Sequence, residues 1–225
     1  TLFLARKIGE EKYKKFINDT GLLKIPEIQI EEVGNPIKFN WNKCKLETVS
    51  YGHGITTTPL QATTIYSILA NGGKIIKPNL VKKNIVEIEK SLVSEKTSQS
   101  INQILRKVVT DEEGTAKLAD ISGYYVGGKT GTSQNYENKS ESLNTFISIF
   151  PSQNPKYALL VMLENPKVAK NLIYNYKGLK VKASRNEAGW NSVYVAGKII
   201  EKIGPILAIK SKEFNYQHVV RKTYR

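Results

Sequence analysis

The sequence predicts an α+β fold, because three successive extended segments stand between segments with helical spacing of apolar residues. The extended segments cover residues 125–132, 143–150 and 157–163, and the last two are apolar enough to be central strands. Helical spacing is found in residues 97–109 before these strands and in residues 188–203 after them. With 225 residues the chain can bury one sizeable core, so we expect one domain or most of one.

The composition excludes several classes of function. The net charge of +14 comes from 34 basic and 20 acidic residues, but the lysines are dispersed and form no basic stripe with interleaved aromatic residues, so we expect no nucleic-acid binding. No run of eighteen apolar residues occurs, and therefore no transmembrane helix is predicted. The single cysteine, Cys44, excludes an internal disulfide, and no second histidine or cysteine stands at metal-ligand spacing from His53 in the sequence. Neither a metal nor a cofactor is predicted.

Two helices are expected in the first third of the chain. Apolar residues at helical spacing predict the first over residues 2–17. A loop over residues 22–41 follows, since prolines and a glycine interrupt it. The second helix begins at Pro59 with Thr58 as its cap, and Gly72-Gly73 ends it.

The last third of the chain is expected to be irregular until a final helix. Asn165-Pro166 opens a connection rich in Lys and Asn, for which we predict mobility. The final helix begins around residues 188–191, and the expected domain ends at residue 204. Residues 205–225 are predicted to form a disordered basic tail. The expected core residues are Ile101, Ile104, Leu105 and Val108 in the helix over 97–109, and Val195, Ile199, Ile200 and Ile203 in the final helix.

The stretch from Val126 to Gln134 reads as an edge strand that could hold a substrate. Strand alternation sends Lys129 and Gly131 to one face and Thr130 and Thr132 to the other. A cation, two hydroxyls and free strand N–H groups suit a carboxylate and a developing oxyanion. Lys-Thr-Gly alone is a weak signal, and the alternative is a glycine-bent edge strand without chemistry.

The surrounding motifs make the signal specific. Glu113-Gly114-Thr115-Ala116 and Gly123-Tyr124-Tyr125-Val126 precede the strand, and Tyr51-Gly52-His53-Gly54 and Ala70-Asn71-Gly72-Gly73 stand further upstream. In this order, the motifs resemble the transpeptidase domain of class B penicillin-binding proteins, and the division (septal) type most of all. The resemblance covers residues 1–204. It implies an antiparallel sheet flanked by helices, the penicillin-binding protein and serine β-lactamase type of transpeptidase fold.

Two motifs of that family are missing from the sequence. No serine has a lysine three positions on, so there is no Ser-x-x-Lys. Two matches to Ser-x-Asn, Ser100-Ile101-Asn102 and Ser133-Gln134-Asn135, are out of place and are interpreted as chance. We interpret the chain as N-terminally incomplete, with Thr1 just downstream of the family's Ser-x-Asn. It would then lack an early strand, so that residues 157–163 present an unpaired edge.

The resemblance implies a role for each residue of the strand. The catalytic residues are Lys129, which supplies positive potential, and Thr132, whose backbone N–H forms half of an oxyanion hole. The substrate-binding residues are Gly128, Thr130, Gly131 and Thr132, and the two threonine hydroxyls bind the terminal carboxylate. The implied enzyme is a serine-type D-Ala-D-Ala transpeptidase that cross-links stem peptides through an acyl-enzyme and binds penicillin.

The resemblance also implies partners and a location. The partners are peptidoglycan stem peptides with their lipid-linked precursor, β-lactams, and the division glycosyltransferase and other divisome proteins. The location is the periplasmic face of the bacterial inner membrane, with a membrane anchor expected before Thr1.

Three alternatives stay open at this stage. They are a non-catalytic penicillin-binding-like scaffold, an elongation-type transpeptidase, and a related acyl-serine hydrolase, for which we identify no water-activating residue. A Ser-x-x-Lys segment upstream in the gene would favour the enzyme over the scaffold.

Overall fold

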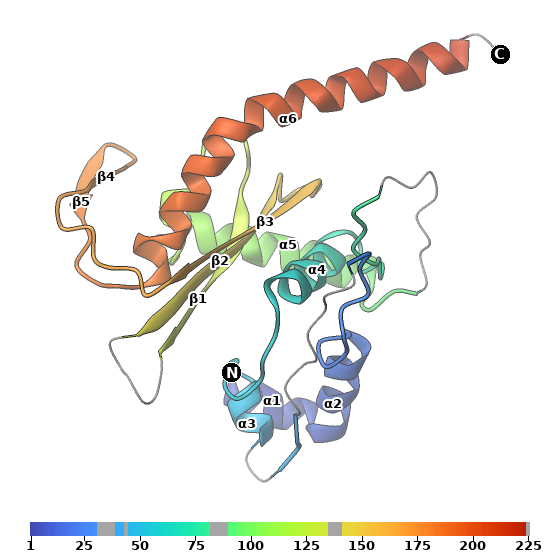
Figure 1. Ribbon diagram of the computed structural model, residues 1–225, viewed down its shortest axis with the longest axis vertical. Coiled ribbons are helices and arrows are strands. Elements are labelled where there is room, and N and C mark those ends of the chain that lie inside the picture. The colour runs from blue at the N-terminus through green and yellow to red at the C-terminus, as the bar shows by residue number, and fades with distance from the viewer. Residues whose placement is uncertain (31–38, 43–44, 82–89, 135–140, 224–225) are drawn as a thin grey trace. The chain divides into compact units, whose positions relative to one another are not determined.

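The computed structural model describes residues 1–30, 39–42, 45–81, 90–134 and 141–223 (Figure 1). The chain divides into two compact units, residues 1–99 and residues 100–225. In the described residues, no helix combines the length and the apolar character that crossing a bilayer requires.

The first unit is helical. It holds α1 (Leu2–Ile8), α2 (Glu10–Asp19), α3 (Lys45–Val49) and α4 (Pro59–Ala70), and its last residues begin α5 (Glu95–Thr110). The prediction of one helix over residues 2–17 is wrong, because Gly9 separates α1 from α2. Gly9 has φ 86° and ψ 153°, a conformation that residues with a Cβ rarely adopt.

The predicted start and end of α4 are confirmed. The Thr58 hydroxyl accepts a hydrogen bond from the Gln61 backbone N–H at 3.1 Å, and the Gln61 side chain accepts one from the Thr58 N–H at 3.0 Å. These two bonds form a capping box, and Pro59 occupies the first helical position. The helix ends at Ala70, just before Gly72 and Gly73, both of which have positive φ.

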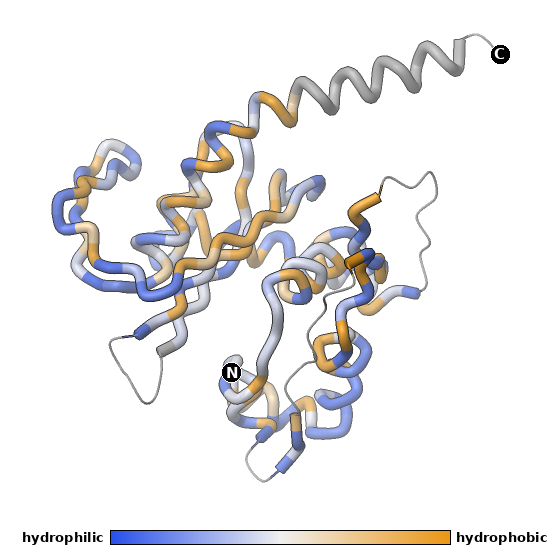
Figure 2. Tube along the Cα trace, in the orientation of Figure 1, coloured by the Kyte–Doolittle hydropathy of each residue, from blue (hydrophilic) through white to orange (hydrophobic). Residues whose placement is uncertain are grey.

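The second unit is built on an antiparallel sheet, which confirms the α+β prediction. Its strands are β1 (Gly127–Gln134), β2 (Ser142–Phe150) and β3 (Tyr157–Glu164), in the order β1-β2-β3. The central strand is β2, as predicted, and Figure 2 shows β2 and β3 as largely hydrophobic. In the described part of the chain β3 lies at an edge of the sheet, as one expectation for residues 157–163 had it, although their apolar character had also favoured a central position.

The core of this unit lies between the sheet and α6 (Ser192–Thr223). Phe146 of β2 and Val161 of β3 are register partners, so they lie on the same face of the sheet. They pack in one buried cluster with Ile200 of α6. Burying a side chain of this size contributes about 1.5–3 kcal/mol to stability, so the cluster fixes α6 on the sheet. Its other fully buried members are Val109, Ala116, Ala119, Val126, Val193 and Ala196.

The final helix is longer than the sequence predicted. It continues through Pro205 to Thr223, over residues that were predicted to belong to a disordered tail, and residues 224–225 of that tail lie outside the described residues. Gly204 lies against the Tyr124 ring, and a Cβ there would come within 2.2 Å of that ring. Leu207, one turn further on, still packs against the core, so burial continues the helix past Pro205.

A β-hairpin occupies part of the connection that was predicted to be irregular. It consists of β4 (Ile173–Tyr176) and β5 (Leu179–Lys182), joined by Lys177 and Gly178, which both have positive φ. Two positive φ values in succession are those of a tight hairpin turn. Tyr174 is buried, and its hydroxyl donates to the Trp190 carbonyl at 2.6 Å, so the hairpin is held against the following segment.

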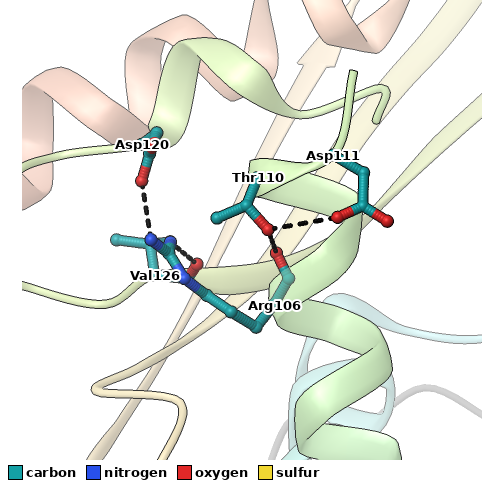
Figure 3. A network of polar contacts seen from close by, with 5 residues as sticks. All are labelled: Arg106, Thr110, Asp111, Asp120 and Val126. Atoms are coloured by element: carbon teal, nitrogen blue, oxygen red, sulfur yellow. Dashed lines mark hydrogen bonds and ion pairs between the residues drawn. The ribbon is translucent and has the colours of Figure 1, made fainter. Parts of the chain in front are cut away.

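Helix α5 is fixed to the start of β1 by an arginine. The Arg106 guanidinium donates to the Val126 carbonyl at 2.7 Å and forms an ion pair with Asp120 at 2.8 Å, as Figure 3 shows. Both side chains are partly buried, so this pair is screened less than a surface pair. The predicted core position of Ile104 is wrong, since this residue is 61% exposed, whereas Leu105 is buried as predicted and Val109 is buried as well.

Candidate active site

A pocket of about 920 Å³ opens beside β1 in the second unit. Four segments form it: the end of α5 with the loop after it, β1, the β4–β5 hairpin, and the turn η2 (Ala188–Trp190). Two of the predicted site residues, Thr130 and Thr132, lie in its wall. The other lining residues are Thr110, Glu112, Glu113, Gly114, Thr115, Lys117, Leu118, Tyr176, Lys177, Leu179, Val181, Glu187, Ala188, Gly189 and Trp190.

The two threonine hydroxyls of β1 are each held by one neighbour. Thr130 and Thr132 are two residues apart on the strand and therefore share a face, as the alternation predicted. The Thr130 Oγ1 lies 2.9 Å from the Thr115 Oγ1. The Thr132 Oγ1 accepts a hydrogen bond from the Ala188 backbone N–H at 3.2 Å. Both hydroxyls are thus positioned before any ligand binds.

The predicted glycines of the strand serve close packing. A Cβ on Gly128 would lie 2.5 Å from the Ile147 carbonyl oxygen and 2.6 Å from the Phe146 ring, so only glycine fits. A Cβ on Gly131 would lie 2.6 Å from the Thr145 hydroxyl. Neither glycine is among the residues that line the pocket.

Lys129 lies on the other side of β1 from the two hydroxyls. Its side chain is exposed, and its ammonium donates to the Thr130 carbonyl at 2.8 Å. Lys129 is a register partner of Ile147 and does not line the pocket. The structure therefore brings Thr130 and Thr132 together in one wall, and it places Lys129 beside that wall.

The wall contributed by the hairpin was missed by the sequence analysis. Tyr176, Leu179 and Val181 line the pocket together with Trp190, and Leu179 is 66% exposed. An apolar wall beside hydroxyl groups is the usual composition of a site for a small organic ligand. The sequence does contain a signal for this hairpin: Lys177-Gly178 is a possible two-residue turn between two short segments in which apolar and polar residues alternate. The many lysines and asparagines around it made the whole connection look irregular.

An asparagine cluster fixes the segment that leads into η2. The Asn186 side chain donates to the Pro166 carbonyl, and its oxygen accepts from the Asn191 amide at 3.1 Å. Nearby, the Tyr174 hydroxyl donates to Trp190, and burial, followed by the Tyr194 hydroxyl, raises the pKa of Tyr174. This phenol therefore stays a proton donor at neutral pH, and the N–H of Ala188 is held in place from both sides.

The matches to Ser-x-Asn lie away from this pocket. Ser100 and Asn102 are in α5, and Ser133 is an exposed residue of β1 whose motif partner, residue 135, lies outside the described residues. Three further matches occur in the sequence: Ser142-Leu143-Asn144, Ser152-Gln153-Asn154 and Ser184-Arg185-Asn186. Ser142 begins β2, Ser184 precedes η2, and Ser152 lies in the connection from β2 to β3, where it is buried and its N–H donates to the Tyr125 carbonyl. None of the described residues of these matches lines the pocket.

The described residues contain no group of three or more His, Cys, Asp or Glu side chains that could hold a metal ion.

Comparison with known proteins identifies the family. The model of the penicillin binding protein transpeptidase domain matches residues 2–188. The chain is 29% identical to the probable peptidoglycan D,D-transpeptidase FtsI of Caulobacter vibrioides, over 94% of this chain and 37% of that protein. It is 31% identical to stage V sporulation protein D of Bacillus subtilis, over 73% of this chain and 28% of that protein. The chain thus spans about a third of the length of these relatives.

Solved structures agree on the fold. The transpeptidase domain of penicillin-binding protein 3 from Burkholderia pseudomallei superposes with a TM-score of 0.76. The match covers 91% of this chain and 60% of that one, at 20% sequence identity. The resemblance predicted from the motifs is confirmed: the chain belongs to the penicillin-binding protein transpeptidase family.

Proposed function

We propose that the protein is a peptidoglycan D,D-transpeptidase, and that Thr130 and Thr132 of this chain bind the terminal carboxylate of its substrate. The observation that carries the proposal is the pair of hydroxyls on the Lys-Thr-Gly strand, which line one pocket and are each held by a neighbour. Hydrogen bonds from hydroxyls to a carboxylate are charge-assisted and hence stronger than neutral ones. Two of them orient the end of a stem peptide.

The proposed reaction has two acyl transfers. A serine of a Ser-x-x-Lys motif, which this sequence does not contain, attacks the penultimate carbonyl, and the terminal D-alanine leaves with the proton from the serine. An amine of a neighbouring stem then attacks the ester and releases the serine, which regains its proton. During each attack the Thr132 N–H donates to the oxyanion, and Lys129 supplies positive potential. A β-lactam follows the first step only.

The cellular role is proposed from the relatives. A relative named as a probable FtsI transpeptidase and one named as a sporulation protein support a role in septal wall synthesis. We therefore propose cross-linking at the periplasmic face of the inner membrane, alongside a division glycosyltransferase and other divisome proteins. The net charge of +14 suits a protein that faces anionic lipid and wall polymer.

Thr132→Val tests the carboxylate assignment in the complete transpeptidase that contains this chain. Valine keeps the shape and the backbone N–H but removes the hydroxyl, so the carboxylate loses one charge-assisted hydrogen bond, worth about 1.5–3 kcal/mol. We expect acylation by a β-lactam acid to slow by about 10- to 100-fold, while acylation by its methyl ester changes much less. The measurement is the second-order acylation rate for the two compounds.

Two further variants serve as controls. Thr132→Ser keeps the hydroxyl and should retain most of the acylation rate. Ser133→Ala removes a hydroxyl from the next residue of β1, which points to the other face, and should change neither rate. If Thr132→Val slows acylation by the acid and by the ester equally, Thr132 only maintains the strand geometry. The proposal that its hydroxyl binds the carboxylate would then be wrong.

A further inference from the structure

Three hydroxyls meet at the pocket wall, and the direction of their hydrogen bonds decides what they can bind. A threonine hydroxyl has one proton to donate and can accept through its lone pairs. At Thr132 the direction is fixed, because the Ala188 backbone N–H can only donate. The Thr132 proton is therefore left for a ligand. Between Thr115 and Thr130, at 2.9 Å, either oxygen can be the donor.

Thr115 is held in place by the backbone on both sides. The Ala116 N–H donates to the Val108 carbonyl at 3.0 Å, and the Gly114 N–H donates to the Asp111 carbonyl at 2.9 Å. Gly114 has no room for a Cβ, which would lie 2.5 Å from the same Val108 carbonyl oxygen. Ala116 is fully buried. The Thr115 side chain nevertheless stays exposed at the pocket, so its hydroxyl is both fixed and accessible.

The turn η2 closes on the same residue from the other side. A Cβ on Gly189 would lie 2.6 Å from the Thr115 carbonyl oxygen, so this close approach requires glycine. Gly189 follows Ala188, whose N–H holds Thr132. The contact between Gly189 and Thr115 therefore positions both groups that hydrogen-bond to the β1 hydroxyls: the Thr115 hydroxyl beside Thr130 and the Ala188 N–H beside Thr132.

The charges around the pocket make the direction of these bonds important. Glu112, Glu113 and Glu187 line it, against the cations Lys117 and Lys177. The Glu187 carboxylate lies 3.7 Å from the Arg185 guanidinium, at an exposed position where such a pair is weak. Among the described lining residues, basic side chains do not outnumber acidic ones, so oriented hydroxyl protons are the groups of this wall that suit an anion.

We propose that Thr115 is a positioning residue that donates its proton to Thr130 and so reserves the Thr130 proton for the carboxylate of the ligand. This inference rests on the proposed function, since it needs Thr130 to face that carboxylate. An anion next to Thr130 selects this direction, because a chain from Thr115 through Thr130 to the anion is polarised head to tail and each bond strengthens the next. The function of the Glu113-Gly114-Thr115-Ala116 motif would then be to hold the Thr115 hydroxyl beside Thr130.

The test is a binding titration of the 225-residue chain by NMR, which needs no acylation. The probes are N-acetyl-D-alanyl-D-alanine and its C-terminal carboxamide, and the readout is the amide shift of Thr130, Thr132 and Ala188. We expect the acid to bind the unsubstituted chain more tightly than the amide. Thr115→Val should weaken binding of the acid by about 3- to 10-fold, the effect of one hydrogen bond, and leave the amide unchanged. Thr115→Ser should restore binding of the acid.

Unchanged or tighter binding of the acid by Thr115→Val would overturn the inference, because Thr130 would then donate to Thr115 in the bound state. Thr130→Val separates this failure from failure of the proposed function. If Thr130→Val removes the preference for the acid and Thr115→Val does not alter it, only the role of Thr115 is wrong. If the unsubstituted chain shows no preference, or Thr130→Val keeps it, the carboxylate assignment itself fails. Thermal unfolding of the two Thr115 variants should match that of the unsubstituted chain, since Thr115 is exposed.

Discussion

The 225-residue chain is expected to form no covalent adduct with a fluorescent penicillin. A serine hydroxyl is a weak nucleophile unless a base beside it removes its proton, and no serine in this sequence has the lysine partner of the Ser-x-x-Lys motif. The Thr130 and Thr132 hydroxyls do not substitute for it, because both are already held by hydrogen bonds that suit ligand binding. Gel fluorescence and intact-protein mass spectrometry measure the outcome.

A control defines what this result means. A complete penicillin-binding protein treated in parallel should be labelled in full, which shows that the reagent is active. An adduct on Ser100, Ser133 or any other serine of the chain would contradict the expectation, and it would place the nucleophile inside these 225 residues.

Lys129→Ala is expected to slow β-lactam acylation of the complete transpeptidase by about 100-fold or more. The ammonium stands at the strand that carries the carboxylate hydroxyls and the proposed oxyanion donor, and removing one preorganised electrostatic contribution of this kind costs a few kcal/mol of transition-state stabilisation. The fold should be unaffected, since the side chain is exposed and an exposed substitution usually changes stability by about 0.5 kcal/mol or less. The measurement is the second-order acylation rate.

Lys156→Ala is the matched control for this variant. It removes the same charge from an exposed position at the start of β3, among residues that line a different pocket, so it should leave the rate unchanged. An unchanged rate in Lys129→Ala would remove Lys129 from the site. Equal slowing by both variants would mean that net charge matters and position does not.

The start of α4 and the strand β1 could be predicted from the sequence, because each depends on residues that are close together in the chain. The start of α4 follows from Thr58, Pro59 and Gln61, which satisfy one another within one turn of helix. The strand β1 and the shared face of Thr130 and Thr132 follow from alternation alone. The structure adds a packing reason for Gly128, because a Cβ at this position would clash with the Phe146 ring.

The elements that the sequence did not predict depend on distant contacts. The β4–β5 hairpin is held by the Tyr174 hydroxyl on Trp190, 16 residues away. The Thr132 hydroxyl receives the Ala188 N–H from 56 residues further along the chain. Helix α6 continues past Pro205 because Leu207 still packs against the core. Helical spacing predicted both Ile104 and Leu105 in the core, but only Leu105 is buried, together with Val109. The spacing defines an apolar stripe but not which edge of the stripe packs.

The measurement that tests the central claim most directly is a structure of this chain with N-acetyl-D-alanyl-D-alanine bound. We expect the carboxylate to lie in the pocket beside β1, with its oxygens about 2.5–2.8 Å from the Thr130 and Thr132 hydroxyls. We also expect the Ala188 N–H still to donate to Thr132 and Thr115 to remain hydrogen-bonded to Thr130. A carboxylate held elsewhere, with both β1 hydroxyls bonded only to Thr115 and Ala188, would contradict the central claim.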